Sequence, residues 1–97
     1  MNRSDQPEER DGAPSVGEVL RTGRDAFASI FGREPESVSG VEKVDGGWRL
    51  AVEVTELERI PQSTSVMASY EVRLSDQGDL EGYRRTRRYY RNQAGEG

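Results

Sequence analysis

The spacing of apolar residues changes from a helical period to an alternating one near residue 37 of the 97-residue chain. Between Ser15 and Gly32, apolar or small residues recur at the spacing of an amphipathic helix with one buried face. That face comprises Val16, Val19, Leu20, Gly23, Phe27, Ile30 and Phe31. Ser15 and Glu18 have the spacing of a capping box, and Gly32 followed by Pro35 is suited to end the helix. Because Gly23 falls on the apolar face, we expect the helix to approach a sheet closely at this position.

Beyond residue 37 the chain predicts four β-strands. Apolar and polar residues alternate along 48–55 and again along 66–74, as in strands with one buried and one exposed face. A shorter strand is predicted over 37–44, with a bulge at Gly40 where the alternation slips, and a last strand over 80–91. We expect the buried face to carry Trp48, Leu50, Val52, Val54, Val66, Ala68, Tyr70, Val72 and Leu74, and the exposed face to carry Arg49, Ala51, Glu53, Thr55, Met67, Ser69, Glu71 and Arg73.

The connections between these strands are short. Residues 45–47 read Asp-Gly-Gly and residues 75–79 contain Gly78, and both sequences are typical of hairpin turns. Pro61 has no N–H to continue a strand, so Leu57 to Ile60 are expected to end the second strand and Gln62 to Ser65 to turn the chain into the third. We therefore predict an α+β fold, with one N-terminal helix packed on a four-stranded antiparallel β-meander whose other face is open.

Composition limits the chain to one small domain. Residues 1–14 contain no large apolar side chain after the initiator methionine, so we predict a disordered acidic tail there. The single α+β domain is expected over 15–91 and a flexible C-terminus over 92–97. Neither Cys nor His is present, which excludes disulfides, thiolate chemistry and imidazole ligands. No apolar run is long enough to span a membrane, no cofactor or metal site is predicted, and we expect a cytoplasmic protein.

Charge is distributed unevenly along the chain. The net charge is −4, but residues 80–93 contain five arginines and one acidic residue, which gives this segment +4 and leaves −8 elsewhere. An acidic body with a basic end favours specific association with another protein. The candidate partner-binding residues lie on the last strand and on the open sheet face: Arg84, Arg85, Arg87, Arg88, Tyr89, Arg91, Arg49, Glu53, Glu71 and Arg73.

Other interpretations of these residues stay open. Charged side chains on an open sheet are often a solvated surface, with cross-strand pairs of about 0.2–1 kcal/mol each. Arginines also protect an edge strand from unwanted pairing, and arginines interleaved with tyrosines could hold the phosphates and stack on the bases of a nucleic acid. The acidic net charge makes nucleic acid the weaker alternative. Glu53, Glu56 and Glu58 are expected near arginines on an open face rather than in a pocket, so no enzymatic activity is predicted.

Short motifs follow one another in the second half of the chain. They are Trp48 with the E-x-x-E of Glu53 and Glu56, then "ERIP", "YEV", the turn from Asp76 to Gly78, and "GYRRTRRYYR" ending at Arg91. In this order they resemble the gas vesicle protein O (GvpO) family. The chain departs from the family pattern after Pro61, where Gln62 and Ser65 stand in place of an expected acidic residue.

The resemblance implies an accessory protein of gas vesicle formation that is not the shell subunit. It would bind other gas vesicle proteins during assembly or nucleation, in the cytoplasm and in association with the vesicle. A mean hydropathy of −0.90 agrees with this, because a water-repelling wall requires apolar subunits. The resemblance implies no enzymatic reaction. A homodimer formed through an exposed strand edge is an alternative mode of association.

Overall fold

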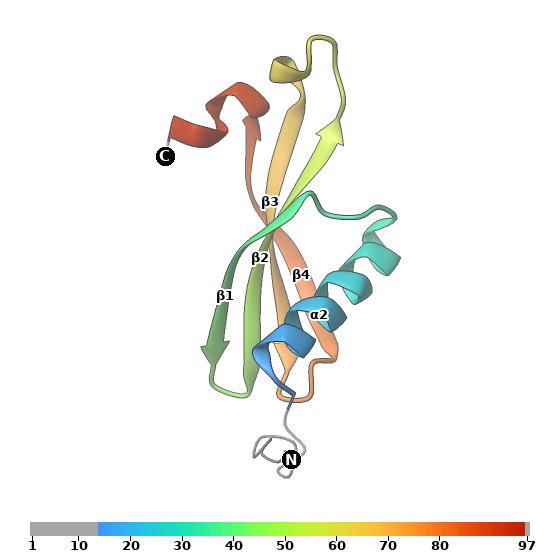
Figure 1. Ribbon diagram of the computed structural model, residues 1–97, viewed down its shortest axis with the longest axis vertical. Helices are drawn as coiled ribbons and strands as arrows, with labels where there is room; N and C mark the ends of the chain where they lie inside the picture. The colour runs from blue at the N-terminus through green and yellow to red at the C-terminus, as the bar shows by residue number, and fades with distance from the viewer. Residues whose placement is uncertain (1–13, 97) are drawn as a thin grey trace, which may run out of the picture.

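The computed structural model describes residues 14–96, which form one helix packed on one antiparallel sheet (Figure 1). The elements are α2 (Val16–Phe31), β1 (Ser37–Val44), β2 (Gly47–Leu57), η1 (Gln62–Thr64), β3 (Val66–Ser75), β4 (Leu80–Tyr90) and η2 (Arg91–Glu96). The strands lie in the order β1-β2-β3-β4 and each pairs antiparallel with the next. The predicted α+β meander is therefore confirmed. The helix is too short and too polar to cross a membrane, and no other helix in the described range meets that requirement either.

The predicted tail over 1–14 lies outside the described residues, apart from Pro14. At the other end, Arg91–Glu96 forms a 3₁₀ turn, and flexibility of residues 92–97 stays a prediction.

Both ends of α2 are capped as the sequence predicts. The Ser15 Oγ accepts a hydrogen bond from the Glu18 N–H at 3.2 Å, and Glu18 Oε1 accepts one from the Ser15 N–H at 3.1 Å. At the C-terminal end, Gly32 has a φ of 97°, in the left-handed region that favours glycine, and its N–H donates to the Ala28 carbonyl. These caps fix the helix over the residues whose apolar face meets the sheet.

Gly23 is the point of closest contact between α2 and the sheet. A Cβ atom added there would lie 2.7 Å from the Cδ1 atoms of Leu50 and Leu74, so the ends of both leucine side chains would have to move. The expected close approach is confirmed. The surrounding core consists of Val19, Phe27, Leu50, Val52, Val54, Ala68, Val72 and Leu74, all of them almost fully buried.

The strand connections follow the local turn chemistry. Asp45 and Gly46 connect β1 to β2, with Gly46 at a φ of 82°. The bulge in β1 falls between Val38 and Gly40, one position before the residue named from the sequence. Strand β1 pairs with β2 only as far as Glu53, so the end of β2 has no strand on that side. There the Arg33 guanidinium donates a 2.6 Å hydrogen bond to the carbonyl of Thr55.

One expectation about the exposed sheet face is wrong. Thr55 and Met67 were predicted to face solvent, but they are only 6% and 3% exposed. The Thr55 hydroxyl donates to the Glu36 carboxylate and accepts from the Arg91 guanidinium, and Met67 lies beside Thr55. The Arg91–Glu36 ion pair therefore covers Thr55 and Met67, which the alternation of the sequence alone would place in water.

Candidate protein-binding surface

The predicted partner-binding residues divide between the two faces of the sheet. Cross-strand register places Arg84 opposite Glu71 and Tyr89 opposite Met67, on the face that points away from α2. We call this face the outer face. A register shift between Ser69 and Tyr70 changes the alternation of β4 near Thr86. The outer face therefore carries Arg49, Glu53, Glu71, Arg73, Arg84, Arg87, Tyr89 and Arg91, whereas Arg85 and Arg88 lie on the helix side.

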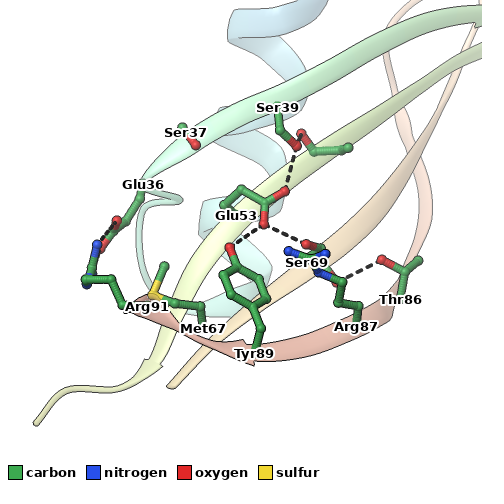
Figure 2. A pocket seen from close by; sticks show the side chains of 11 residues that line it. Glu36, Ser37, Ser39, Glu53, Met67, Ser69, Thr86, Arg87, Tyr89 and Arg91 are labelled. Carbon is green, nitrogen blue, oxygen red and sulfur yellow. Dashed lines mark hydrogen bonds and ion pairs between the residues drawn. The ribbon is translucent and has the colours of Figure 1, made fainter. Parts of the chain in front are cut away.

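Glu53 is the centre of a polar network on the outer face (Figure 2). Its Oε1 accepts hydrogen bonds from the Ser69 hydroxyl at 2.6 Å and the Tyr89 hydroxyl at 2.7 Å, and its Oε2 accepts one from the Ser39 hydroxyl at 2.6 Å. The three donors come from β1, β3 and β4, so one carboxylate connects all four strands. Burial, together with the hydrogen bond to Glu53, raises the pKa of Tyr89 above its ordinary value. The Arg87 guanidinium lies 4.3 Å from the centre of the Tyr89 ring, a cation–π contact.

The network lies in an open hollow of about 550 Å³. Its lining is mixed in charge and polarity: Glu36, Ser37, Ser39, Ala51, Glu53, Met67, Ser69, Thr86, Arg87, Tyr89 and Arg91. This corrects the expectation of a face without a pocket. The hollow offers hydroxyls, one half-buried carboxylate and guanidinium groups at its edge, which suits the side chains of another protein.

Arg91 closes one end of the hollow by pairing with Glu36. Its Nη2 lies 2.6 Å from Glu36 Oε2 and its Nη1 lies 3.1 Å from Oε1, which makes the pair bidentate. The hydrogen bonds from Arg91 and then from Thr55 hold the pKa of Glu36 below its ordinary value. The residue just before β1 is thereby joined to the residue just after β4.

The other end of the outer face is a charged cluster around Glu71. The Glu71 carboxylate lies 2.9 Å from Arg84 Nη2 and 3.5 Å from Arg49 Nη1. Arg49 also pairs with Glu42 at 3.1 Å, and this contact above all raises the pKa of Arg49. Arg73 lies opposite Arg49 on the next strand and is exposed. Of the outer-face arginines, Arg73 and Arg87 form no salt bridge with a carboxylate in residues 14–96.

Glu56 organises the two arginines on the helix side. It lies 2.9 Å from Arg88 Nε and 3.2 Å from Arg85 Nη1, and it accepts a 3.0 Å hydrogen bond from the Tyr70 hydroxyl. Burial alone raises the pKa of Glu56, but the hydrogen bonds from Tyr70, Arg85 and Arg88 together outweigh it and lower the value. The Tyr70 ring in turn packs against Phe31 of α2, with ring centres 5.2 Å apart.

Sequence reasoning did not select Glu36, Ser39, Glu56 and Ser69 as site residues. The alternation along β3 does place Ser69 on the outer face, because it lies two positions before Glu71, and the register sets it opposite Glu53. Glu36 and Glu56 gave no such signal, since one precedes its strand and the other lies at a register shift in β2. Their roles depend on arginines more than 25 positions away in sequence.

These ion pairs bear on the two alternative functions, nucleic-acid binding and catalysis. Four of the five arginines of the basic segment, Arg84, Arg85, Arg88 and Arg91, pair with carboxylates of the same chain, so they do not form a continuous row for phosphates. The lowered pKa values of Glu36 and Glu56 make them poor proton donors near neutral pH. Within residues 14–96, no group of His, Cys, Asp or Glu side chains is arranged to hold a metal ion.

The fold and this surface define a small α+β domain with a charged, open sheet face, a class suited to association. Residues 2–95 match the family described as gas vesicle synthesis protein GvpO, and the chain belongs to this family. It is 48% identical to gas vesicle protein O of Streptomyces sp. (strain CB03234) over 92% of this chain and 68% of that protein. It is 30% identical to gas vesicle protein O1 of Halobacterium salinarum over 88% of this chain and 77% of that protein.

A third relative extends the same pattern. Gas vesicle protein O of Haloferax mediterranei is 32% identical over 70% of this chain and 49% of its own length. No solved structure matches the chain. The family resemblance stated from the second half of the sequence is confirmed and extends over nearly the whole chain.

Proposed function

We propose that the protein is an accessory, non-shell component of gas vesicle formation that binds other gas vesicle proteins during assembly or nucleation. It acts by association rather than as an enzyme, in the cytoplasm at the growing vesicle. Membership of the gas vesicle family supports the process. The observation that supports association is the outer face, which α2 leaves uncovered.

The outer face combines the features of a protein-binding surface. It presents arginine and tyrosine, residues that are enriched at binding hot spots, around a hollow of about 550 Å³. Arg73 and Arg87 are exposed and unpaired within residues 14–96, so an acidic group of a partner would reach them without displacing an internal salt bridge. We therefore propose Arg73 and Arg87 as the residues whose charge attracts the partner, and the paired arginines as their structural support.

A homodimer through the free edge of β4 is the alternative mode of association. Antiparallel pairing of two β4 strands would bring Arg84–Arg88 of one copy against the same segment of the other. Like charges facing each other across strands are destabilising. This argument favours a different gas vesicle protein as the partner.

The test is charge reversal at the two unpaired arginines. Arg73→Glu and Arg87→Glu, made separately, should each reduce co-purification with the other gas vesicle proteins of the same genome by at least fivefold. Arg21→Glu is the matched control, because Arg21 is an exposed arginine on α2 without a salt bridge in the described range. Circular dichroism should show an unchanged fold in all three variants. Unreduced co-purification of both outer-face variants would refute this surface as the binding site.

A further inference from the structure

The helix covers only part of the sheet face against which it packs. With 16 residues, α2 is about 24 Å long, whereas the molecule measures 51 Å along its longest axis. Strands β2, β3 and β4 continue beyond the C-terminal end of α2, toward the β2–β3 corner (Figure 1). On this side the molecule has two layers at one end and a single layer at the other.

The uncovered end carries exposed apolar side chains. Leu57 pairs with Val66, and Val66 pairs with Tyr90, so these three residues form a row across three strands. Val66 lies four positions before Tyr70 in β3, so both side chains are on the same face of the sheet. Because Tyr70 packs against α2, the row lies on the helix side. Leu57 is 47% exposed, Tyr90 is 48% exposed, and Ile60 in the adjoining corner is 99% exposed. We call Leu57, Ile60, Val66 and Tyr90 the apolar row. Clustered apolar exposure of this kind marks interaction sites.

A hollow of about 380 Å³ adjoins the apolar row and is positively charged. It is lined by Arg59, Val66, Arg88, Tyr89, Tyr90 and Gln93. Glu56 is the carboxylate that Arg85 and Arg88 share. Arg59 is exposed and forms no salt bridge in residues 14–96. Guanidinium groups therefore outnumber the carboxylates that pair with them at this end, and a docking segment should carry acidic residues beside apolar ones.

We propose that the apolar row and the adjoining hollow dock an acidic amphipathic helix of a partner protein. A helix fits because an apolar sheet face is normally covered by helices, and α2 already covers the other half of this face in that way. Its leucine-like side chains would lie on the apolar row, including Ile60, and its carboxylates would reach Arg59 and Arg88. The apolar row lies on the face opposite the Glu53 hollow, and Tyr89 at the β4 edge lines both hollows. The domain can therefore hold one partner on each face and act as a bridge.

The test uses isotope-labelled full-length protein and a synthetic peptide, acetyl-ELLEELLKELLEEL-amide, followed by NMR. Saturable shift changes are expected at the amides of Leu57, Val66, Arg88 and Tyr90. Replacing every Glu of the peptide by Lys should weaken binding at least fivefold. Ile60→Asp should weaken binding at least tenfold. Ile30→Asp is the matched control, because Ile30 is an isoleucine of α2 that is 58% exposed, and it should leave binding unchanged.

Several outcomes would overturn the proposal. They are equal binding of the lysine peptide, equal weakening by both isoleucine variants, shift changes confined to other residues, and no saturable shift up to millimolar peptide. Sedimentation velocity of the protein without peptide tests whether it self-associates through the same row. If the protein self-associates and Ile60→Asp abolishes this, the occupant is a second copy of the chain and the partner-helix assignment is wrong. Charge reversal at Arg73, which lines neither hollow, should not affect peptide binding, so the peptide test and the co-purification test can fail independently.

Discussion

The Tyr89 hydroxyl of β4 donates a 2.7 Å hydrogen bond to Glu53 of β2, which joins two strands that β3 separates in the sheet. Ser69 of β3 donates to the same carboxylate oxygen and lies between them. The contact spans 36 positions of sequence, so it forms only when the whole meander is in register. It makes the outer face a defined structure rather than a row of solvated side chains.

Removal of this hydroxyl should weaken the fold. Tyr89→Phe keeps the ring but leaves Glu53 with one donor fewer, and hydrogen bonds to charged groups contribute about 1.5–3 kcal/mol. We expect a loss of roughly 1–2 kcal/mol in the free energy of unfolding, measured by urea denaturation. Tyr90→Phe is the control, because no hydrogen bond of its hydroxyl occurs within the described residues. An equal loss in both variants would contradict the role of Glu53.

Two glycines of α2 should respond in opposite directions to substitution by alanine. At Gly23 the new methyl group would lie 2.7 Å from Leu50 and Leu74, and overpacking of this kind costs about 1–3 kcal/mol. At Gly17 the nearest atom is the Ser15 Oγ at 3.9 Å, so the gain in helix propensity, about 1 kcal/mol, is not opposed. Thermal unfolding should therefore show a lower Tm for Gly23→Ala and a higher Tm for Gly17→Ala. A higher Tm for both would mean that the helix does not approach the sheet as closely as described.

Stability should decrease in acid because of the paired carboxylates. The pKa values of Glu36 and Glu56 are lower in the folded protein than their ordinary value of 4.5. Their ionised forms therefore stabilise the fold above pH 4.5, and this contribution is lost as the pH falls through the folded-state pKa values. Urea denaturation at several pH values should show this loss, and Glu56→Gln should make it smaller. Asp25→Asn, which replaces an exposed carboxylate of α2, should retain the full pH dependence.

The side chain of Arg33 should stabilise the unpaired end of β2. Its guanidinium donates to the Thr55 carbonyl at 2.6 Å, where β1 no longer pairs. Arg33→Met keeps the length of the side chain but removes the donor, and should cost about 0.5–1.5 kcal/mol. Arg21→Met, at an exposed position of α2, should change the free energy of unfolding by less than half of that. Unchanged stability in Arg33→Met would show that water replaces the guanidinium at this carbonyl.

Much of the fold is encoded in local signals. Ser15, Glu18 and Gly32 define the ends of α2 through short-range hydrogen bonds, and Gly46 and Gly78 supply the turn conformations. Each signal acts within a few residues, so it can be recognised in the sequence. The alternation along β2 and β3 then identifies the buried face, because both strands keep the same parity over most of their length.

The site was less predictable because it depends on register shifts. The shift near Thr86 separates Arg84 and Arg87 from Arg85 and Arg88, although all four belong to one basic run. The shift before Leu57 turns Glu56 toward the helix side, where it meets Tyr70. A bulge has no fixed sequence signature when no glycine marks it. Contacts between distant residues, such as that of Arg91 with Glu36, become visible only in three dimensions.

The position of β4 after the other three strands in the sequence has a consequence for synthesis on the ribosome. Glu36, Glu53 and Glu56 emerge first, and the residues that bind them, Arg85, Arg88, Tyr89 and Arg91, are translated later. A nascent chain without these residues carries half-buried carboxylates that lack their donors, and such a state is unfavourable. The sheet should therefore close only after β4 has emerged from the ribosome, so the outer face is not available to partners before that point.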